Sequence, residues 1–304
     1  MSIDEPLEST IVAAGSTGPW SHRDRETPPT MPGALINRQQ QGFPKLQLGQ
    51  VWAHRELIWF LGARDVRIRY KQMFLGGLWA VMHPLAQMAL YAVVFGYIAK
   101  LPAENGLPYG VFIFTALVPW QYFANSLSAV SMCMVTNQNL IQKIAFPRLV
   151  LPVSAMIAPI VDMVVAMCVA MLMLVVFGFS PQWRMLLIPL FFPVAALTAF
   201  AIGIWLSAIN VRYRDVQHLI PFAMLFWFYL TPVVYSKQLV PDGLLRYVCE
   251  LNPMQLVTTG VRWAALGTDP PQLMSLASLP LLLVMLVCGL YYFRRSESSF
   301  ADVV

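Results

Sequence analysis

Charged side chains are scarce in this sequence. Asp, Glu, Lys and Arg make up 12% of the 304 residues, about half of the roughly 25% typical of soluble domains. Hydrophobic residues make up 58%, and the mean hydropathy is +0.62. Apolar surface on this scale needs lipid as its solvent, so the composition excludes a water-soluble globule and indicates an integral membrane protein.

Metal-binding, disulfide and catalytic patterns are also absent. The four cysteines form no C-x-x-C pair and have no histidine at ligand spacing, so we expect them to be small buried apolar residues. The sequence has no G-x-x-x-x-G-K-[ST] phosphate loop, no H-E-x-x-H and no G-x-S-x-G. We therefore expect no catalytic residue, metal or cofactor in this chain, and any energy source must be another subunit.

The first 49 residues differ from the rest. They contain a Pro-rich stretch at 27–33 and a Gln run at 39–41, without sustained apolar periodicity, which predicts a disordered cytosolic tail. Their longest apolar stretch, 11–14, is too short for a secretory signal and follows acidic residues. Residues 50–304 are expected to form one transmembrane domain.

Six apolar segments follow, each near the ~20 residues that cross ~30 Å of hydrocarbon as a helix. The predicted fold is therefore an all-α membrane protein with six transmembrane helices. The segments are 78–99, 111–135, 153–177, 185–209, 219–235 and 277–293.

The basic residues beside these segments set the orientation. Twelve flank one side and five the other, which places both termini in the cytoplasm and explains the net charge of +5 without nucleic acid. The larger group comprises Lys45, Arg55, Arg64, Arg67, Arg69, Lys71, Lys143, Arg148, Arg212, Arg214, Arg294 and Arg295, and the smaller group Lys100, Arg184, Lys237, Arg246 and Arg262.

Two intervals fit neither a span nor a simple loop. Residues 51–71 mix Trp and Phe with charged residues, which suits a helix in the cytoplasmic interface. Residues 236–275, on the external side, hold apolar pieces too short to span, as in re-entrant helices before the last span.

Asp162 and a basic cluster each allow two interpretations. Asp162 lies deep in a predicted span and could relay protons, but without a second titratable partner we favour an interhelical hydrogen bond or a position near the headgroups. The cluster of Arg64, Arg67, Arg69 and Lys71 could bind a phosphate-bearing headgroup. From charge alone, an orientation signal is the better interpretation.

Two short cytosolic loops pair apolar anchors with charges. In 139–148, Ile141, Ile144 and Phe146 have no soluble core to cover them, which implies a docked partner. The loop 210–216 taken alone is an ordinary basic connector.

Aromatic residues are abundant in the spans. They usually form interfacial belts or packing, but those at 226–229 lie in the middle of a segment, and an aromatic-lined passage would suit a glycan. The residues predicted to line such a passage are Tyr91, Phe95, Trp120, Tyr122, Phe226, Trp227 and Tyr229.

Several local motifs occur in one order from residue 50 to the end. They are R-D-V-R-I-R-Y-K-Q at 64–72, L-G-G-L-W-A-V-M-H-P-L at 75–85, N-L-I at 139–141 with F-P-R at 146–148, N-V-R-Y-R-D-V at 210–216, L-N-P-M at 251–254, and Phe293 with Glu297 and F-A-D at 300–302. Together they resemble the membrane permease of bacterial ATP-binding cassette (ABC) exporters of lipid-linked polysaccharide, the O-antigen, capsule and teichoic acid export family.

The resemblance implies a homodimer in the bacterial inner membrane with two copies of a cytosolic ABC ATPase docked beneath, which would bind ATP and Mg²⁺. It implies an interfacial helix at 51–60 and a coupling helix at 139–148. A polyprenyl-diphosphate headgroup would meet the basic cluster, and the glycan would then thread through the dimer. The residues expected to couple the ATPase are Asn139, Ile141, Lys143, Ile144, Phe146, Pro147, Arg148, Arg212, Arg214 and Asp215.

Two other functions stay open at the sequence level. A related exporter could carry a drug or small lipid, but it would not need the basic cluster before the first span. A membrane-embedded glycan-modifying enzyme would need a carboxylate or histidine constellation at a membrane face, whereas His22, His54, His83 and His218 are scattered.

Overall fold

The computed structural model describes residues 48–71, 78–213 and 215–303, all within the compact unit Gly42–Val304. Every regular element in these ranges is helical, and they contain no strand. The expected all-α class is therefore confirmed. The tail predicted at 1–49 lies outside the described residues, except for its last two positions, which begin a helix.

Four helical segments are long and apolar enough to cross a membrane. The first joins α3 (Leu78–Tyr91) to the π-helix η1 (Ala92–Ile98), and the second joins α6 (Val150–Ala155) to α7 (Ile157–Val176). The third joins η3 (Trp183–Leu187) to α8 (Ile188–Arg212), and the fourth joins η5 (Leu273–Ala277) to α12 (Ser278–Val303). The chain is thus an integral membrane protein.

The other two predicted spans are also helices but differ from these four. The 28 residues of α4 (Tyr109–Thr136) are long enough to span, but polar groups such as Gln121 and Asn125 lower its hydropathy. The 15 residues of α9 (Val216–Leu230) cover only about 22 Å. Helix α9 ends before the expected boundary at 235 because Thr231 leaves helical geometry ahead of Pro232.

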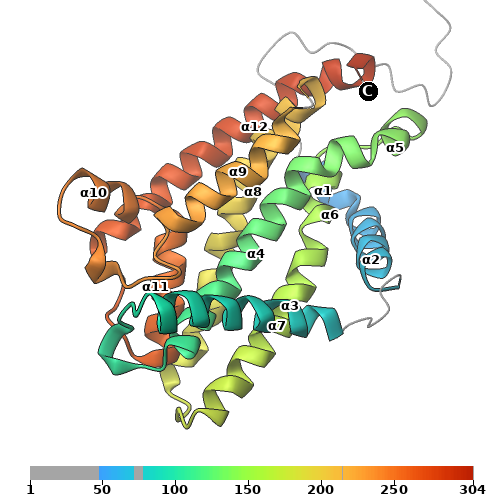
Figure 1. Ribbon diagram of the computed structural model, residues 1–304. Coiled ribbons are helices and arrows are strands. Elements are labelled where there is room, and N and C mark those ends of the chain that lie inside the picture. Colours follow the sequence, from blue (N-terminus) through green and yellow to red (C-terminus); the bar gives the residue numbers. More distant parts are fainter. Residues whose placement is uncertain (1–47, 72–77, 214, 304) are drawn as a thin grey trace, which may run out of the picture. The chain divides into compact units, whose positions relative to one another are not determined.

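Helix α4 lies at the centre of the bundle (Figure 1), and most of its length is buried. It packs most extensively against α8, and also against α7, α6, α3 and α11. Gly203 allows the approach of α8, since a Cβ there would lie 2.7 Å from Val130 Cγ1. The core is therefore built around one helix that contributes little lipid-facing surface.

The predicted interfacial helix is two helices, α1 (Leu48–Ala53) and α2 (Arg55–Lys71), which meet at His54. Helix α2 packs against α6 and α7. The contact is close at Gly62, where a Cβ would lie 2.2 Å from Ile157 Cδ1. Helix α2 is therefore seated directly on a spanning helix.

The region 236–275 contains two helices that are too short to span, α10 (Leu244–Glu250) and α11 (Pro253–Leu266). Helix α11 begins where Asn252 Oδ1 accepts a hydrogen bond from the Met254 N–H (3.0 Å). It ends at Gly267 in the left-handed conformation (φ 71°). It is almost wholly buried against α4 and α8. Short 3₁₀ turns, η2 (Glu104–Gly106) and η4 (Lys237–Leu239), lie in the loops before α4 and α10.

The cysteines only partly match the expectation that all are buried. Cys133 and Cys249 are buried, whereas Cys168 on α7 and Cys288 on α12 are exposed. The expectation is wrong for the latter two because membrane helices carry apolar residues on their outer faces as well as inside the bundle.

Candidate functional site

Helix α2 separates the predicted basic cluster onto two faces. Arg64, Arg67 and Lys71 recur at intervals of three and four residues, so they share one face. With Phe60, Ala63 and Ile68 they line a groove of about 360 Å³. Arg69 lies on the opposite face, which packs on α7. Of the four charges that the sequence grouped together, three line one groove and Arg69 does not.

Arg69 is tied to the membrane domain. Its guanidinium forms an ion pair with Asp162 of α7, and the Tyr70 hydroxyl donates a hydrogen bond to the other carboxylate oxygen. The side chains of Arg69 and Asp162 are 36% and 23% exposed. Burial raises the pKa of Tyr70, and the bond to Asp162 raises it further, so the hydroxyl remains a donor. The expected interhelical hydrogen bond of Asp162 is thus confirmed.

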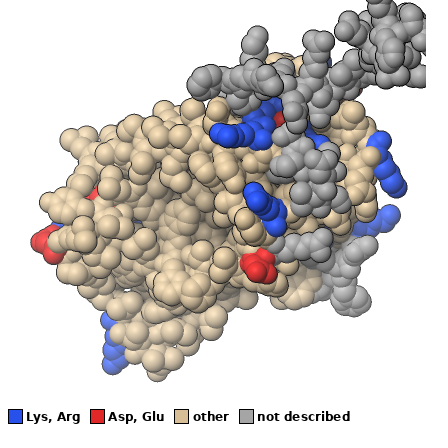
Figure 2. Space-filling model, turned by 90° about the horizontal axis from the view of Figure 1, so that it is seen from above, with Lys and Arg blue, Asp and Glu red and all other residues tan. Residues whose placement is uncertain are grey.

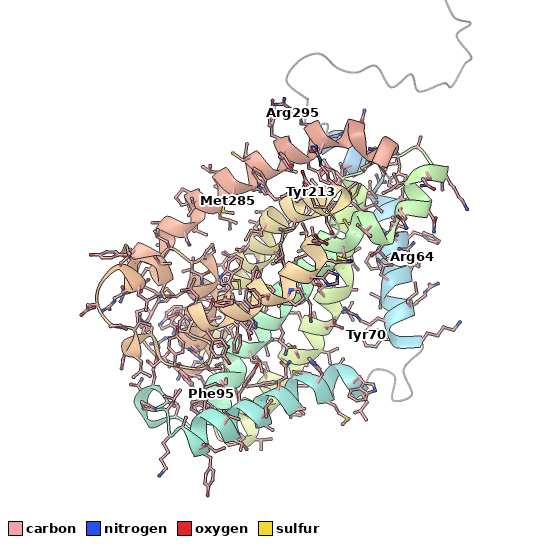
Figure 3. The ribbon with its side chains drawn as sticks, turned by 45° about the horizontal axis from the view of Figure 1, so that its top comes forward. Arg64, Tyr70, Phe95, Tyr213, Met285 and Arg295 are labelled. Atoms are coloured by element: carbon pink, nitrogen blue, oxygen red, sulfur yellow. The ribbon has the colours of Figure 1, made fainter. Side chains whose placement is uncertain are left out.

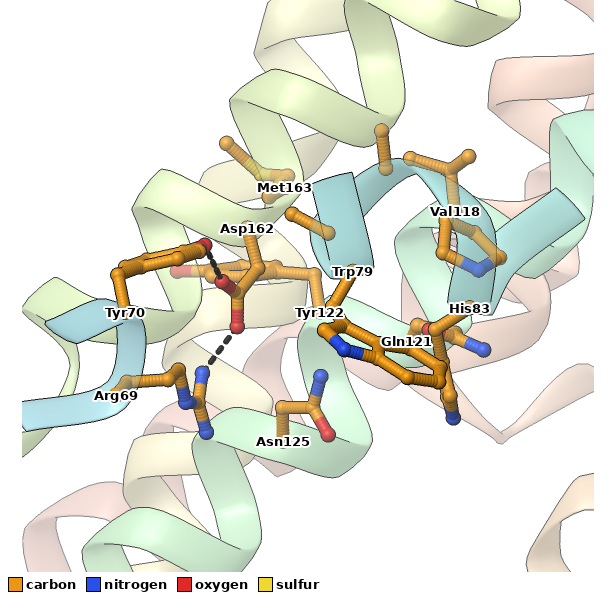
Figure 4. A pocket seen from close by; sticks show the side chains of 13 residues that line it. Arg69, Tyr70, Trp79, His83, Val118, Gln121, Tyr122, Asn125, Asp162 and Met163 are labelled. Carbon is orange, nitrogen blue, oxygen red and sulfur yellow. Dashed lines mark hydrogen bonds and ion pairs between the residues drawn. The ribbon is translucent and has the colours of Figure 1, made fainter. Parts of the chain in front are cut away.

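A second cavity, of about 430 Å³, adjoins this ion pair. It lies between the end of α2 and helices α3, α4 and α7. Figure 4 shows Arg69, Tyr70 and Asp162 on one side of it and Trp79, His83 and Gln121 on the other. Its lining is completed by Ala80, Pro84, Val118, Tyr122, Asn125, Met163 and Ala166.

Helix α5 (Gln138–Lys143) follows α4 in the region expected to couple to an ATPase. Ile144 is 54% exposed, as expected of a docking residue. Ile141 and Phe146 pack against the protein's own core, so the expectation that they lack cover is wrong, because α2, α6 and α12 supply a core there. Asn139, Lys143 and Pro147 lie in or beside this short helix.

Two sets of hydrogen bonds join this coupling region to other helices. Arg64 of α2 donates to Asn137 Oδ1 (2.8 Å), at the junction of α4 and α5. The Arg148 N–H donates to Glu297 Oε1 of α12 (3.3 Å), and its guanidinium donates to the Glu297 carbonyl oxygen. Arg294 also donates to Glu297 (2.8 Å). The segment after α5 is therefore fastened to the end of the last helix.

The second predicted coupling loop connects α8 to α9. Arg212 is the last residue of α8, with its guanidinium 5.6 Å from the centre of the Tyr213 ring. Asp215 precedes α9. Arg214 lies outside the described residues. Figure 3 shows Tyr213, Arg295 and Arg64 far from Phe95, which lies toward the opposite end of the bundle.

The seven aromatic residues predicted to line a passage do not share one surface. Trp120 and Tyr122 are buried, and Trp120 packs against Phe228 at 5.4 Å between ring centres. Tyr91 stacks on the same Phe228 ring, with Phe95 6.1 Å from Tyr91.

On α9, Trp227 points inward and donates to Asn252 Oδ1 (3.1 Å). Phe226 is 63% exposed, and Tyr229 is also exposed. Of the predicted set, these two lie on an open surface of the described chain.

A buried arginine holds the opposite end of the bundle together, and sequence reasoning missed its role. Arg262 of α11 donates to the carbonyl oxygens of Phe112 (3.2 Å), Pro232 (2.6 Å) and Val233. Its guanidinium lies 3.7 Å from the centre of the Phe112 ring. Burial lowers its pKa to about 9, which leaves it charged at neutral pH. A lone arginine within an otherwise apolar short helix was the available signal.

Comparison with known proteins identifies the family to which this chain belongs. The ABC-2 type transporter family model matches residues 56–266. The chain is 27% identical over 252 residues to the O-antigen export system permease protein RfbA of Myxococcus xanthus, covering 82% of this chain and 96% of that one. It is 28% identical over 268 residues to RfbA of Klebsiella pneumoniae, covering 86% and 98%.

A more distant relative is the polysialic acid transport protein KpsM of Escherichia coli. It is 22% identical over 242 residues, covering 78% of this chain and 92% of KpsM. The family model covers most of the chain, including the groove, the cavity and the coupling helix. This chain belongs to the ABC-2 type transporter family and is a transporter subunit, not an enzyme.

Proposed function

We propose that this protein is the permease of an exporter that moves lipid-linked polysaccharide, similar to O-antigen, from the cytosolic to the external face of the bacterial inner membrane. The observation that carries the proposal is its similarity, over more than 80% of its length, to permeases named for O-antigen export. Family membership implies a separate ABC ATPase, since the chain has no phosphate loop of its own.

The exporter is a homodimer of six-span subunits with both termini cytoplasmic. In this arrangement α4 and α9 cross the membrane with the four apolar spans, and α9 reaches across with the turn that follows it. Figure 2 supports the orientation, because most of the Lys and Arg residues in that view gather toward the end that carries α1, α2 and α5. The α10 and α11 helices then form the external end.

Two ATPase subunits, each loaded with ATP and Mg²⁺, dock on the cytosolic loops. Helix α5 and exposed Ile144 fill a groove in the ATPase, with Lys143 and Arg148 at its rim. Residues 212–215 make a second, smaller contact. Movement of α5 is passed to α2 through Arg64 and to α12 through Arg148.

The headgroup of the lipid carrier binds the α2 groove. Arg67 and Lys71 offer two cationic groups beside exposed Phe60 and Ile68, a combination that suits a diphosphate next to a hydrocarbon chain. Arg64 lines the same groove but already pairs with Asp65 and Asn137. Exposed Phe226 and Tyr229 on α9 then contact successive sugars weakly enough for them to slide.

The direct test is export by the complex reconstituted with its ATPase in proteoliposomes. We expect ATP-dependent movement of lipid-linked glycan, purified from the source cells, and stimulation of ATP hydrolysis by that glycan lipid. If the complex moves a hydrophobic drug but not the glycan lipid, the substrate class is wrong. If the purified chain alone modifies the glycan, the subunit assignment is wrong.

The groove is tested in the same complex with bare polyprenyl diphosphate as the probe. For Arg67→Ala with Lys71→Ala we expect the concentration for half-maximal ATPase stimulation to rise by about tenfold or more, because two charge-assisted contacts to phosphate are lost. Arg55→Ala is the matched control, since Arg55 is exposed on α2 and outside the groove. An equal effect of the control would contradict the headgroup role.

A further inference from the structure

The cavity between α2, α3, α4 and α7 contains polar groups without partners. Both His83 and Asn125 line the cavity from exposed positions, and in the part of the chain that the structure describes neither has a hydrogen bond. Gln121 donates to Gln87, which leaves its own carbonyl oxygen unused. These groups come from α3 and α4 and face the same space (Figure 4).

The position of the cavity makes such groups costly. Its walls include α3 and α7, which both belong to segments apolar enough to span the membrane. Hydrocarbon offers no hydrogen bonds, so polar side chains facing it need a partner. A polar ligand in this space would supply the missing hydrogen bonds.

Charge and shape narrow the class of ligand. Arg69 and Asp162 neutralise one another at the cavity wall, so no unpaired carboxylate or guanidinium among the lining residues calls for an ion. The unpaired groups are amides and an imidazole, which both donate and accept hydrogen bonds. Trp79 adds an aromatic surface, and Val118 and Met163 add an apolar wall. A neutral polyol with one apolar face matches this combination.

We propose that this cavity binds sugar residues of the exported glycan, an inference that rests on the proposed function. Its volume of about 430 Å³ falls in the range of small-molecule sites and admits roughly one or two sugar rings. Asn125, Gln121 and His83 bind hydroxyl groups, and the Trp79 ring contacts the apolar face of a sugar. The cavity and the α2 groove lie on different sides of α2. The permease therefore recognises the sugar at one site and the headgroup of the carrier lipid at another.

The test compares two probes on the permease–ATPase complex in nanodiscs: the lipid-linked glycan from the source cells, and bare polyprenyl diphosphate. For Asn125→Leu we expect the half-saturating concentration of the glycan lipid to rise about tenfold, as for the loss of one or two neutral hydrogen bonds. That of the bare lipid should stay within about twofold. Ser128→Leu is the matched control, because Ser128 is exposed on α4 outside the cavity.

A second variant, His83→Leu, tests the cavity independently in case Asn125→Leu does not fold. It should show the same selective loss of affinity for the glycan lipid. Equal loss for both probes would mean that the cavity holds the carrier lipid, and no loss for either would mean that it holds water or meets the second subunit. Both results would overturn the proposal. If neither probe stimulates the wild-type complex, the proposed function itself fails, which is a distinguishable outcome.

Discussion

Asp162 shows how a charged residue is accommodated inside this membrane protein. A carboxylate in a span usually suggests ion or proton movement. Here both of its oxygens accept hydrogen bonds, from Arg69 and Tyr70 at the end of α2. Its role is therefore to anchor α2 to α7. The Arg69–Asp162 ion pair also lines the adjoining cavity, where the two opposite charges cancel.

This anchor gives a prediction for stability. Asp162→Ala leaves the Arg69 guanidinium without its counter-charge, and we expect a loss of about 1–2 kcal/mol, discounted because Arg69 is partly solvent-exposed. Thermal unfolding of the purified protein would measure it, and Arg69→Ala in the same background should recover part of the loss. Asp242→Ala is the control, since the Asp242–Arg246 pair is on the surface and Asp242 is 86% exposed. An equal shift in the control would contradict the anchoring role.

At the scale of helices, the proposed coupling segment at 138–148 is connected to α2 and to α12, which lie near the beginning and at the end of the described residues. Arg64 links it to α2, and Arg148 links it to α12 through Glu297. Helix α12 packs along α8, which packs on central α4. A displacement of α5 therefore reaches the last helix directly as well as through α4.

This connection predicts uncoupling when Glu297 is replaced. In Glu297→Ala the Arg148 N–H and Arg294 lose a shared acceptor, while the bond from the Arg148 guanidinium to the main-chain carbonyl at position 297 remains. We expect ATP hydrolysis to continue while glycan exported per ATP falls about threefold or more, as expected for the loss of one or two charge-assisted bonds. Glu297→Gln keeps one acceptor oxygen and should give an intermediate ratio. An unchanged ratio in both variants would show that the contact holds the fold without transmitting motion.

The helices were largely predictable from sequence, whereas their ends and partners were not. Hydropathy predicted a helix at each of the six apolar segments, because long apolar runs in lipid must satisfy their backbone internally. It did not predict the break at His54, which has no proline or glycine to mark it. The separation of Arg69 from the groove follows from helical periodicity alone. Its pairing with Asp162, 93 residues away, required the tertiary structure.

For the whole molecule, the uneven distribution of Lys and Arg predicts its orientation. We expect a cysteine placed at Ala145 to be cytoplasmic and one at Asp269 to be external, in a variant whose four native cysteines are replaced by alanine. Both positions are exposed. A membrane-impermeant maleimide should label Asp269→Cys in intact spheroplasts and Ala145→Cys only after permeabilisation. The reverse pattern would invert the topology and remove the proposed ATPase contact.

The contacts of Arg262 also have a consequence for which substitutions this end of the bundle tolerates. The acceptors of its hydrogen bonds are main-chain carbonyls of Phe112, Pro232 and Val233, so the bonds survive exchange of many neighbouring side chains. This end of the bundle keeps its framework when its surface side chains change. Side chains around this cation can therefore be exchanged for others of similar size while its grip on the three main-chain segments is kept.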